Sequence, residues 1–444
     1  MSAPEGLAAE LCRLLAAQRS ERRLPSVSAA VFRGGELIWG EALGLADVSA
    51  ARPATPDTQY RIGSITKTFT AVAIMQLRDA GELGLEDTLQ THIPEAPHDG
   101  PTIRRMLAHV SGLQREPPGE VWETLEDPPI EEMLENLGQA EGVLPPGAYW
   151  HYSNLAYALL GEIVARRTGS RAIDHIDARI IKPLGLDRTT WTPNGRAATG
   201  YFVQPYSDAV TAEKSVELRG SAPIGQLWST TGDLARWGAF LAEGDAAVLE
   251  PKTVEEMHAF QSLVPYVKGW KLGWGLGLEL FRDGDRILAG HGGAMPGFLA
   301  NLVVSREDGT GAVALSNSSA GASMDVLSLA LARKTVELLP PAPDQWDPGE
   351  APPAEVADVL GRWWSEGHEF VFRVRRGKLE ATLAEAVAAL EPTVFEPDGD
   401  DRFRAVSGME RGELLRIVRD DDGRVAKLYW ATYPFTREPR VFGS

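Results

Sequence analysis

The sequence predicts an α+β fold, in which an antiparallel sheet is flanked by helices and followed by a small all-β domain. Strand-like segments occur near the start of the chain and again before residue 320, whereas the segment between them is mainly helical. A length of 444 residues also exceeds what one hydrophobic core usually supports. We therefore expect a first domain over residues 1–337, a linker over 338–356 and a second domain over 357–444.

The first 81 residues predict a helix, a hairpin and a second helix. Leucines at helical spacing indicate a packing helix over about residues 5–19. The stretch "SVSAAVFRGGELIWGEALG" has the pattern of two strands around a turn at Gly34 and Gly35. In "SITKTFTAVAIMQLRDAG" the apolar residues cover a broad helical face, and the helix is expected to end near Gly81. Ser64 is thus expected at a helix N-terminus.

The middle of the chain is rich in loops and helices, and strands return late. The stretch "SNLAYALLGEIVARRTG" predicts a helix that ends at Gly169. Four later stretches, "WGLGLEL", "DRILAGHGG", "FLANLVVS" and "GAVALSN", follow one another at hairpin spacing and predict strands. The simplest arrangement is one sheet built from both ends of the first domain, with a helical region inserted between them.

The C-terminal part begins with a change of composition. From Leu338 the chain reads "LLPPAPDQWDPGEAPPAE", and this density of proline is typical of an extended linker. Short strand-like runs such as "FVFRVRRGKLEATL", "LLRIVRD" and "VAKLYWATY" then alternate with Gly and Asp turns. This pattern predicts a small sandwich or barrel.

Charge and cysteine content exclude several classes of function. With 44 basic and 62 acidic residues the formal net charge is -18, which disfavours nucleic acid and anionic membrane surfaces as partners. The single cysteine, Cys12, cannot form an internal disulfide, and the eight histidines show no metal-binding spacing. The first residues lack the pattern of a signal peptide, and no apolar run is long enough to span a membrane. We expect a cytoplasmic protein without metal or cofactor.

Ser64 and Lys67 in "RIGSITKTFT" are the first candidates for chemistry. Residues three apart share a helical face, so the lysine amine can reach the serine hydroxyl. A lysine takes up that proton only if burial and nearby positive potential lower its pKa. Alone, the spacing is more typical of a helix-capping serine followed by a solvated lysine.

Two later motifs change this interpretation. The order of "SITK" at 64–67, "YSN" at 152–154 and "HGG" at 291–293 resembles the active-site motifs of serine β-lactamases and penicillin-binding proteins of the class C type. The segments "TIRRMLAHVSGL", "LPPGAYWHYSNLAYALLGEIVARRTG", "GQLWSTTGDLARWGAFL" and "HGGAMPGFLANLVV" also resemble that family. The resemblance covers about residues 20–335 and implies a β-lactamase-like first domain.

The resemblance implies a role for each motif residue. Ser64 would be the nucleophile that forms an acyl-enzyme, and Lys67 would be its base. Tyr152 would pass protons to the leaving group, and Asn154 would hydrogen-bond Lys67 and a substrate amide.

The third motif would lie on the edge of a strand, beside the substrate. His291 stands where the family more often has lysine, so attraction for a carboxylate should be weaker. Gly292 and Gly293 would let the substrate backbone approach closely, and the N–H groups of Ser64 and Ala294 would form the oxyanion hole.

The second domain narrows the expected function. A proline-rich linker followed by a β-domain resembles the lipocalin-like domain of certain D-aminopeptidases. It also resembles stand-alone penicillin-binding-protein-type thioesterases that cyclise nonribosomal peptides. Our leading expectation is such a cyclase, which takes a peptidyl thioester with a C-terminal D-residue, with a peptidyl carrier protein as a possible partner. The alternatives are a D-stereospecific aminopeptidase or amidase, a carboxylesterase, and a catalytically silent scaffold.

Three further residues are candidate substrate contacts. Trp228, in "GQLWSTTGD", could line an apolar cleft, although packing in the core is an equally good interpretation. Arg437 and Arg440 lie in the last segment, "ATYPFTREPRVFGS". In the cyclase relatives an arginine of this domain reaches the active site, which makes these two residues candidates for contact with the substrate backbone or carboxylate.

Overall fold

The molecule consists of two compact units, Met1–Pro341 and Ala342–Ser444. The computed structural model describes residues 3–265, 269–319, 324–342, 345–385 and 391–441. Within these ranges, no helix combines the length and the apolar character that crossing a bilayer requires.

A nine-stranded antiparallel sheet forms the centre of the first unit, in the order β3-β2-β1-β13-β12-β11-β10-β9-β8. Strand β1 pairs with β2 on one side and with β13 on the other, where Val27 lies opposite Ser316. The prediction of a sheet built from both ends of the domain is therefore confirmed. Its strands are β1 (Ser26–Arg33), β2 (Glu36–Asp47), β3 (Arg52–Pro53), β8 (Ser262–Leu263), β9 (Leu272–Trp274), β10 (Glu279–Asp283), β11 (Arg286–Met295), β12 (Phe298–Val304) and β13 (Gly311–Ser316).

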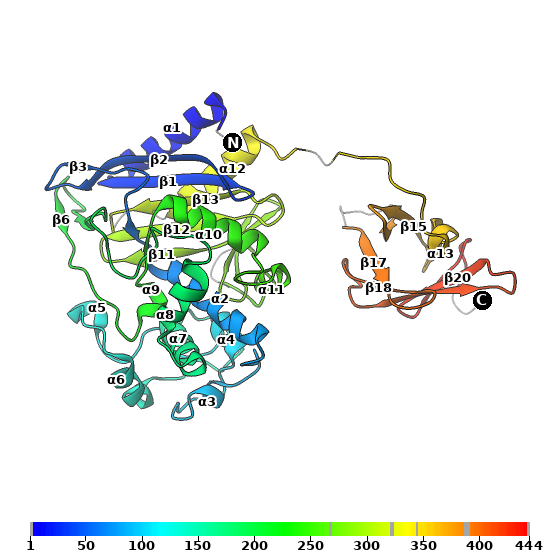
Figure 1. Ribbon diagram of the computed structural model, residues 1–444, viewed down its shortest axis with the longest axis horizontal. Coiled ribbons are helices and arrows are strands. Elements are labelled where there is room, and N and C mark those ends of the chain that lie inside the picture. Colours follow the sequence, from blue (N-terminus) through cyan, green and yellow to red (C-terminus); the bar gives the residue numbers. More distant parts are fainter. Residues whose placement is uncertain (1–2, 266–268, 320–323, 343–344, 386–390, 442–444) are drawn as a thin grey trace. The chain divides into compact units, whose positions relative to one another are not determined.

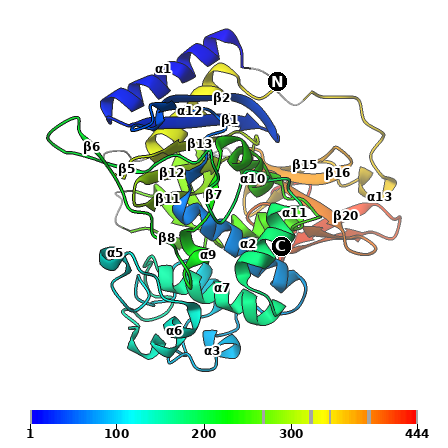
Figure 2. The same cartoon turned by 60° about the vertical axis from the view of Figure 1, so that its left-hand side comes forward.

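Helices cover both faces of this sheet (Figures 1 and 2). Side chains alternate between the faces along each strand. Val31 and Val303 thus pack toward α1 (Glu5–Glu21) and α12 (Met324–Leu338). Phe32 follows Val31 in β1, and Leu302 precedes Val303 in β12. Both belong to the larger core on the opposite face, where they pack against α10 (Thr231–Glu243).

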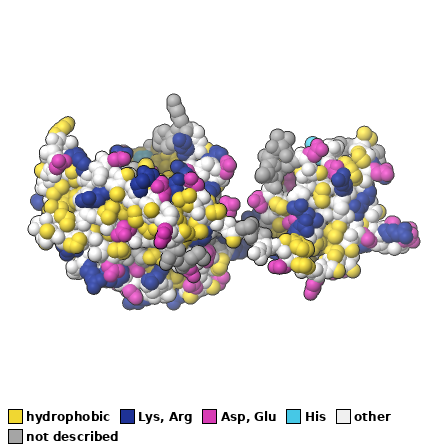
Figure 3. Space-filling model, turned by 90° about the horizontal axis from the view of Figure 1, so that it is seen from above, with side chains coloured by type: hydrophobic (Ala, Val, Ile, Leu, Met, Phe, Trp, Pro, Cys, Tyr) yellow, Lys and Arg dark blue, Asp and Glu magenta, His cyan; other side chains and the backbone are white. Residues whose placement is uncertain are grey.

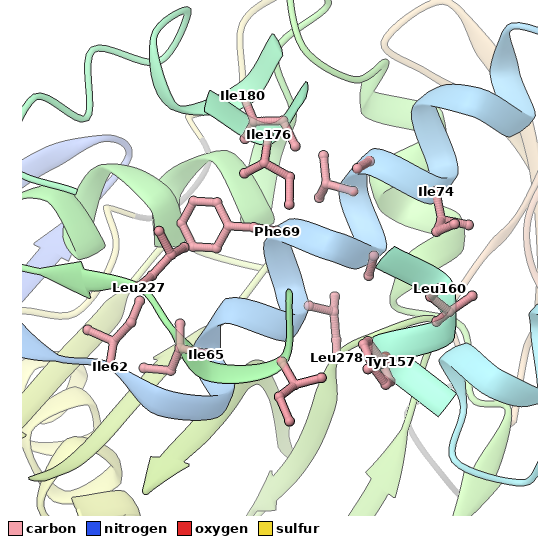
Figure 4. Close-up of a cluster of buried hydrophobic side chains, with 14 of the residues drawn as sticks. Ile62, Ile65, Phe69, Ile74, Tyr157, Leu160, Ile176, Ile180, Leu227 and Leu278 are labelled. Carbon is pink, nitrogen blue, oxygen red and sulfur yellow. The ribbon is translucent and has the colours of Figure 1, made fainter. Parts of the chain in front are cut away.

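The helix α2 (Thr66–Asp79) lies in this larger core, between the sheet and the helical region. Figure 4 shows apolar side chains packed around it, among them Ile176, Leu160 and Leu227, together with Phe69 of the helix itself. A helix buried on every side has little freedom to move. The remaining helices of the unit are α3 (Leu89–His92), α4 (Ile103–Leu107), α5 (Val121–Thr124), α6 (Ile130–Glu135), α7 (Asn154–Thr168), α8 (Ala172–Ile176), α9 (Ala222–Gly225), α10 (Thr231–Glu243) and α11 (Pro251–Met257).

Short elements complete the first unit. One 3-10 turn, η1 (Gly63–Ile65), leads directly into α2. The other short elements are η2 (Leu137–Gln139), the π-helical η3 (Asp177–Ile181), and the strand pairs β4 (Tyr60–Arg61) with β7 (Trp228–Ser229) and β5 (Tyr201–Val203) with β6 (Val210–Ala212).

The stretch "WGLGLEL" is not one strand, contrary to the prediction. Strand β9 ends at Trp274, and β10 begins only at Glu279. Between them the N–H of Leu276 donates to the carbonyl of Met257, and Gly277 has a φ of +83°, which favours glycine. This turn places Glu279 at the first position of β10, opposite Gly290 of β11.

The second unit is a nearly closed antiparallel barrel of eight strands, which confirms the predicted lipocalin-like barrel. The edge strands meet through two hydrogen bonds between Trp364 and Thr436. Inward residues such as Trp363, Phe372 and Phe395 form its core. Its elements are α13 (Ala354–Ala357), β14 (Gly361–Ser365), β15 (His368–Arg375), β16 (Lys378–Leu383), β17 (Thr393–Pro397), β18 (Arg402–Ala405), β19 (Leu414–Arg419), β20 (Val425–Trp430) and β21 (Tyr433–Phe435).

Acidic and basic side chains are interspersed over the face shown in Figure 3. Neither sign of charge gathers into a large continuous patch on that face.

Candidate active site

Ser64 lies on η1 and Lys67 in the first turn of α2, as the sequence predicted. The Nζ atom of Lys67 is 3.0 Å from Ser64 Oγ and 3.0 Å from the carbonyl oxygen of Ile224 in α9. The lysine side chain is fully buried. Burial lowers the pKa of Lys67 to about 7, because an ammonium group is disfavoured away from water. At neutral pH a substantial fraction of Lys67 is therefore a neutral amine beside the serine hydroxyl.

A close approach of β11 to η1 forms the opposite side of the site. A Cβ atom on Gly293 would lie 2.0 Å from the carbonyl oxygen of Ile62 and 3.3 Å from the Ser64 nitrogen. Gly63 has a φ of +51°, and a Cβ there would lie 2.7 Å from the nitrogen of Ala294. Only glycines permit this contact. It brings the backbones of Ser64 and Ala294 close together, and their predicted role as an oxyanion hole depends on that proximity.

Tyr152 is packed directly against this pair. Its ring centroid lies 5.1 Å from Lys67 Nζ, and its ring stacks on that of His109 at 4.2 Å. Burial raises the pKa of the Tyr152 phenol, while its interaction with the Ser64 side chain lowers it. The phenol is therefore protonated at neutral pH and can act as a proton donor.

His109 is a supporting residue that the sequence analysis missed. Its Nδ1 accepts a hydrogen bond of 3.0 Å from the Ser153 N–H, and burial lowers its pKa well below the ordinary value. The ring is thus neutral and holds Tyr152 by stacking. Its φ of +54° is unusual for a residue other than glycine. The segment "AHVSGL" contained the residue, but no spacing in the sequence connected it with Tyr152.

Asn154 makes a different contact from the one predicted. Its Nδ2 donates to both carboxylate oxygens of Glu116, at 2.8 and 2.9 Å, and Lys67 instead donates to Ser64 and to Ile224. The N-terminal end of α7 explains this, since its N–H groups at Asn154 and Leu155 bond the carbonyl of Arg115 and bring Glu116 alongside. The Oδ1 atom of Asn154 is buried without a partner among the described residues, and Asn154 lines the cleft. This oxygen can accept a substrate N–H.

His291 is a neutral residue of β11 that lines the cleft. Burial, together with the smaller effect of the charge of Lys67, lowers the pKa of His291 to about 3. Its Nδ1 interacts with the carbonyl oxygen of Gly292. The site consequently lacks the positive charge that lysine supplies at this position, which agrees with the expected weak attraction for a carboxylate. Gly292 and Gly293 line the cleft beside it.

Glu279 is the second residue that the sequence analysis missed. Its carboxylate accepts the N–H of Gly292 at 2.7 Å. Burial raises the pKa of Glu279 to about 7, although that hydrogen bond and Lys67 act in the opposite direction. No motif marks the residue, because its place beside His291 depends on the register of β10 against β11.

The cleft has a volume of about 550 Å³ and an acidic lining. Three carboxyl groups, those of Glu116, Glu279 and Asp325, line it together with the guanidinium of Arg115. A carboxylate-rich wall favours a cationic group of the substrate. The partly exposed ring of Trp122 contributes apolar surface. Among the described residues, no cluster of histidine, cysteine, aspartate and glutamate could hold a metal ion.

Trp228, predicted as a substrate contact, lies in the core instead. Its ring packs edge-on against Phe298 at 5.1 Å, and strand β7 pairs with β4. It is 4% exposed and is not part of the cleft lining. Pairing of β7 turns this side chain into the interior, and the core interpretation is the one that the structure supports.

The two C-terminal arginines differ in their surroundings. The Arg437 guanidinium lies 3.9 Å from the centroid of Trp363 and donates to the carbonyls of Asp358, Leu360 and Arg362. Its two terminal nitrogens thus donate within the barrel, and its predicted contact with the substrate stays a prediction. Arg440 lies exposed after β21, and its predicted contact stays a prediction.

Comparisons with known proteins agree with this geometry. Residues 11–337 match the family model described as Beta-lactamase, and residues 352–437 match a domain of unknown function, DUF7586. Esterase EstB of Burkholderia gladioli is 36% identical over 220 residues, which cover 46% of this chain and 55% of the esterase. The chain spans between 50% and 63% of the length of the curated relatives that it matches.

Solved structures show similar folds. The D-amino acid amidase of Ochrobactrum anthropi SV3, in a complex with L-phenylalanine amide, is 27% identical with a TM-score of 0.64, over 76% of this chain and 98% of the amidase. The octameric penicillin-binding protein homologue of Pyrococcus abyssi is 22% identical with a TM-score of 0.66, over 97% of this chain and 99% of that protein. The likeness to the Pyrococcus abyssi protein extends over both units of this chain.

Proposed function

Because the chain belongs to the β-lactamase family of serine hydrolases and acyltransferases, we propose that Ser64 attacks an acyl donor and forms an acyl-enzyme. One observation carries this proposal: the 3.0 Å contact between Ser64 Oγ and Lys67 Nζ, with a lysine whose pKa lies near 7. A base with a pKa near the working pH is effective in proton transfer. Burial of Lys67 without such a role would only destabilise the fold.

The reaction follows from these positions. Neutral Lys67 takes the Ser64 proton while Oγ bonds to the carbonyl carbon, and the N–H groups of Ser64 and Ala294 stabilise the oxyanion. Collapse of the tetrahedral intermediate breaks the bond to the leaving group, which receives a proton from the Tyr152 phenol. Lys67 then passes the proton that it took from Ser64 to Tyr152, which restores the phenol. Water or a neutral amine then attacks the Ser64 ester and loses a proton to the same groups as its bond to carbon forms. Collapse of that intermediate breaks the bond to Oγ, and Ser64 takes the proton back.

The acidic cleft favours donors with a free ammonium group. Glu116 and Glu279 both line the cleft with Ser64, and His291 contributes no positive charge. A D-aminoacyl amide or ester satisfies these features, and the likeness to the D-amino acid amidase supports the D configuration. We therefore place the chain among amidases and aminopeptidases that act on D-residues.

A second candidate is release of a peptidyl thioester as a macrolactam, with a carrier protein as the donor. The cleft of about 550 Å³ exceeds the needs of a single residue and could hold several. In this candidate the peptide's own amine replaces water as the acceptor. The two candidates share the acylation of Ser64 and differ only in the acceptor.

Intact-mass analysis and product analysis with a matched panel test the proposal. The panel contains D-phenylalanine amide, its L enantiomer, N-acetyl-D-phenylalanine amide, a p-nitrophenyl ester and a linear peptidyl thioester with a C-terminal D-residue. We expect release of ammonia from the D amide, with kcat/KM at least about tenfold lower after N-acetylation, since an unpaired carboxylate then replaces an ion pair.

The other outcomes separate the alternatives. Cyclic product from the thioester, with little turnover of the amides, would establish the second candidate. Turnover of the p-nitrophenyl ester alone would support a carboxylesterase. If none of the five compounds modified Ser64, the acyl-enzyme proposal would be wrong and the scaffold interpretation would replace it.

A further inference from the structure

The barrel contains a cavity of its own, with a volume of about 600 Å³. Strands β14, β15, β16, β17, β20 and β21 contribute inward side chains to its lining. Five of the lining residues are apolar or aromatic members of these strands, Phe370, Ala381, Leu383, Trp430 and Phe435, and two buried ones, Ser365 and Thr393, are polar. Its volume falls within the range of about 300–1,000 Å³ that is typical of small-molecule sites.

The cavity occupies only one end of the barrel interior. At the other end Val356 and Val359 pack on the barrel core, and the Trp363 N–H donates to the Val359 carbonyl at 2.6 Å. Ser365, two residues after Trp363 on the same face of β14, lines the cavity. The barrel thus has a filled end and a hollow end, although the same strands form both.

Aromatic rings form the floor and part of the mouth of this cavity. Phe370, Trp430 and Phe435 contact one another, with ring centroids 5.1 to 6.2 Å apart. Tyr433 and Met409 also line the cavity and are 46% and 83% exposed. Apolar side chains exposed at the entrance of a hollow mark a surface that a ligand can cover. Aromatic faces also attract organic cations.

The charged residues in the lining all have the same sign. Glu366, Glu391 and Glu410 line the cavity, whereas none of its described lining residues is lysine or arginine. All three glutamates are exposed. An exposed carboxylate beside an apolar hollow repels fatty acids and attracts cations. Charge and apolar surface together therefore select a ligand with an apolar body and a positive end.

We propose that the barrel is a binding site for a small organic cation, an alkyl- or arylammonium, whose apolar part enters the cavity while its charge lies among the three glutamates. The site belongs to the barrel alone and does not depend on the proposed reaction at Ser64. Binding of the cation involves no covalent step.

Calorimetric titration of the full-length protein with two ten-carbon probes tests the proposal. Decyltrimethylammonium and decyl sulfate carry the same tail and opposite charges. We expect the cation to bind at least about tenfold more tightly than the anion, with an affinity that falls as salt is added. Equal affinities, or no binding of the cation, would overturn the proposal.

Two triple variants locate the binding. In the first, Glu366→Gln, Glu391→Gln and Glu410→Gln remove the charges of the cavity, and we expect at least about fivefold weaker binding of decyltrimethylammonium. In the control, Glu355→Gln, Glu413→Gln and Glu438→Gln change the net charge equally at exposed positions outside the lining. Affinity should then stay within twofold of the parent. An equal loss in both would show attraction by net charge alone and would overturn the site.

Filling the cavity is the second measurement. Ala381→Phe, at a buried lining position, should abolish binding of the probe while the far-ultraviolet circular dichroism of the protein stays the same. If this variant fails to fold, the paired glutamate variants still decide the question, because their side chains are exposed. If Glu116→Gln and Glu279→Gln weakened binding of the cation while the barrel variants left it unchanged, the cation would lie in the serine cleft. That result would contradict the proposal.

Discussion

The serine cleft and the barrel cavity have similar volumes and opposite constructions. In the cleft, burial shifts the pKa values of two bonded groups: Lys67, which contacts Ser64, and Glu279, which accepts the Gly292 N–H. In the barrel, the interior is aromatic and the carboxylates stay at the exposed mouth. Proton transfer requires groups whose pKa values burial has shifted, whereas binding requires only complementary surface. If both proposals hold, the acyl transfer and the binding of the cation belong to separate units.

The largest expected effect belongs to the nucleophile. Ser64→Ala should lower kcat/KM for D-phenylalanine amide by at least about 10³-fold, because no other group can form the ester. Binding of decyltrimethylammonium, measured by calorimetry on the same sample, should be unchanged. Substantial residual activity would remove Ser64 from the mechanism. A parallel loss of cation binding would break the separation between cleft and cavity.

The next largest effect is expected at the glycine contact beside the proposed oxyanion hole. Gly293→Ala should reduce kcat by about 10²- to 10³-fold, since an added methyl displaces η1 from β11 and misplaces one donor. The matched control is Gly40→Ala on β2, where the nearest atom would lie at an ordinary 3.8 Å. Steady-state kinetics of both variants, together with their melting temperatures, check this. Equal kcat values would show that the close approach has no catalytic importance.

A moderate effect is expected from Arg437. Arg437→Ala should destabilise the barrel by about 1 kcal/mol, because the guanidinium packs on Trp363 and bonds backbone carbonyls at a partly exposed site. A lower temperature of the thermal unfolding transition of the barrel would show the loss of stability. Turnover at Ser64 should be the same as in the parent. A fall in turnover without loss of stability would instead support the substrate contact predicted from sequence.

The smallest effects are expected from changes to Glu116 and Arg115, which should shift the pH dependence of turnover in opposite directions. If neutral Lys67 is the base, turnover of a neutral ester, p-nitrophenyl acetate, rises with pH through about 7. Glu116 raises the pKa of Lys67 and Arg115 lowers it. Glu116→Gln should therefore move the rise to lower pH, and Arg115→Gln should move it to higher pH. Glu279 titrates in the same range, so the midpoint belongs to the coupled groups. Shifts in the same direction would contradict the assignment of Lys67.

Local patterns were enough to predict much of this molecule. The spacing of Ser64 and Lys67 fixes their contact, because both lie within one turn of helix. Alternation of apolar residues likewise predicted the strands of the sheet and of the barrel. Interactions within a few residues of one another can be read from sequence because the backbone geometry is regular.

Contacts between distant segments could not be predicted in this way. Glu279 reaches the site because a turn ends β9 and sets the register of β10 against β11, and Asn154 bonds Glu116 because α7 begins beside the carbonyl of Arg115. Trp228 is oriented by a two-residue strand pair. In each case the deciding interaction involves a partner far away in the chain, for which the local sequence has no signal.

The pairing of β1 with β13 also affects how the protein is made. Ser64 and Lys67 leave the ribosome long before Ala294, and β1 cannot pair with β13 until synthesis has passed Ser316. Long-range pairings of this kind form late, after the local hairpins and helices. A growing chain would therefore carry its serine without an oxyanion hole, and it could not acylate itself or its neighbours before the sheet closes.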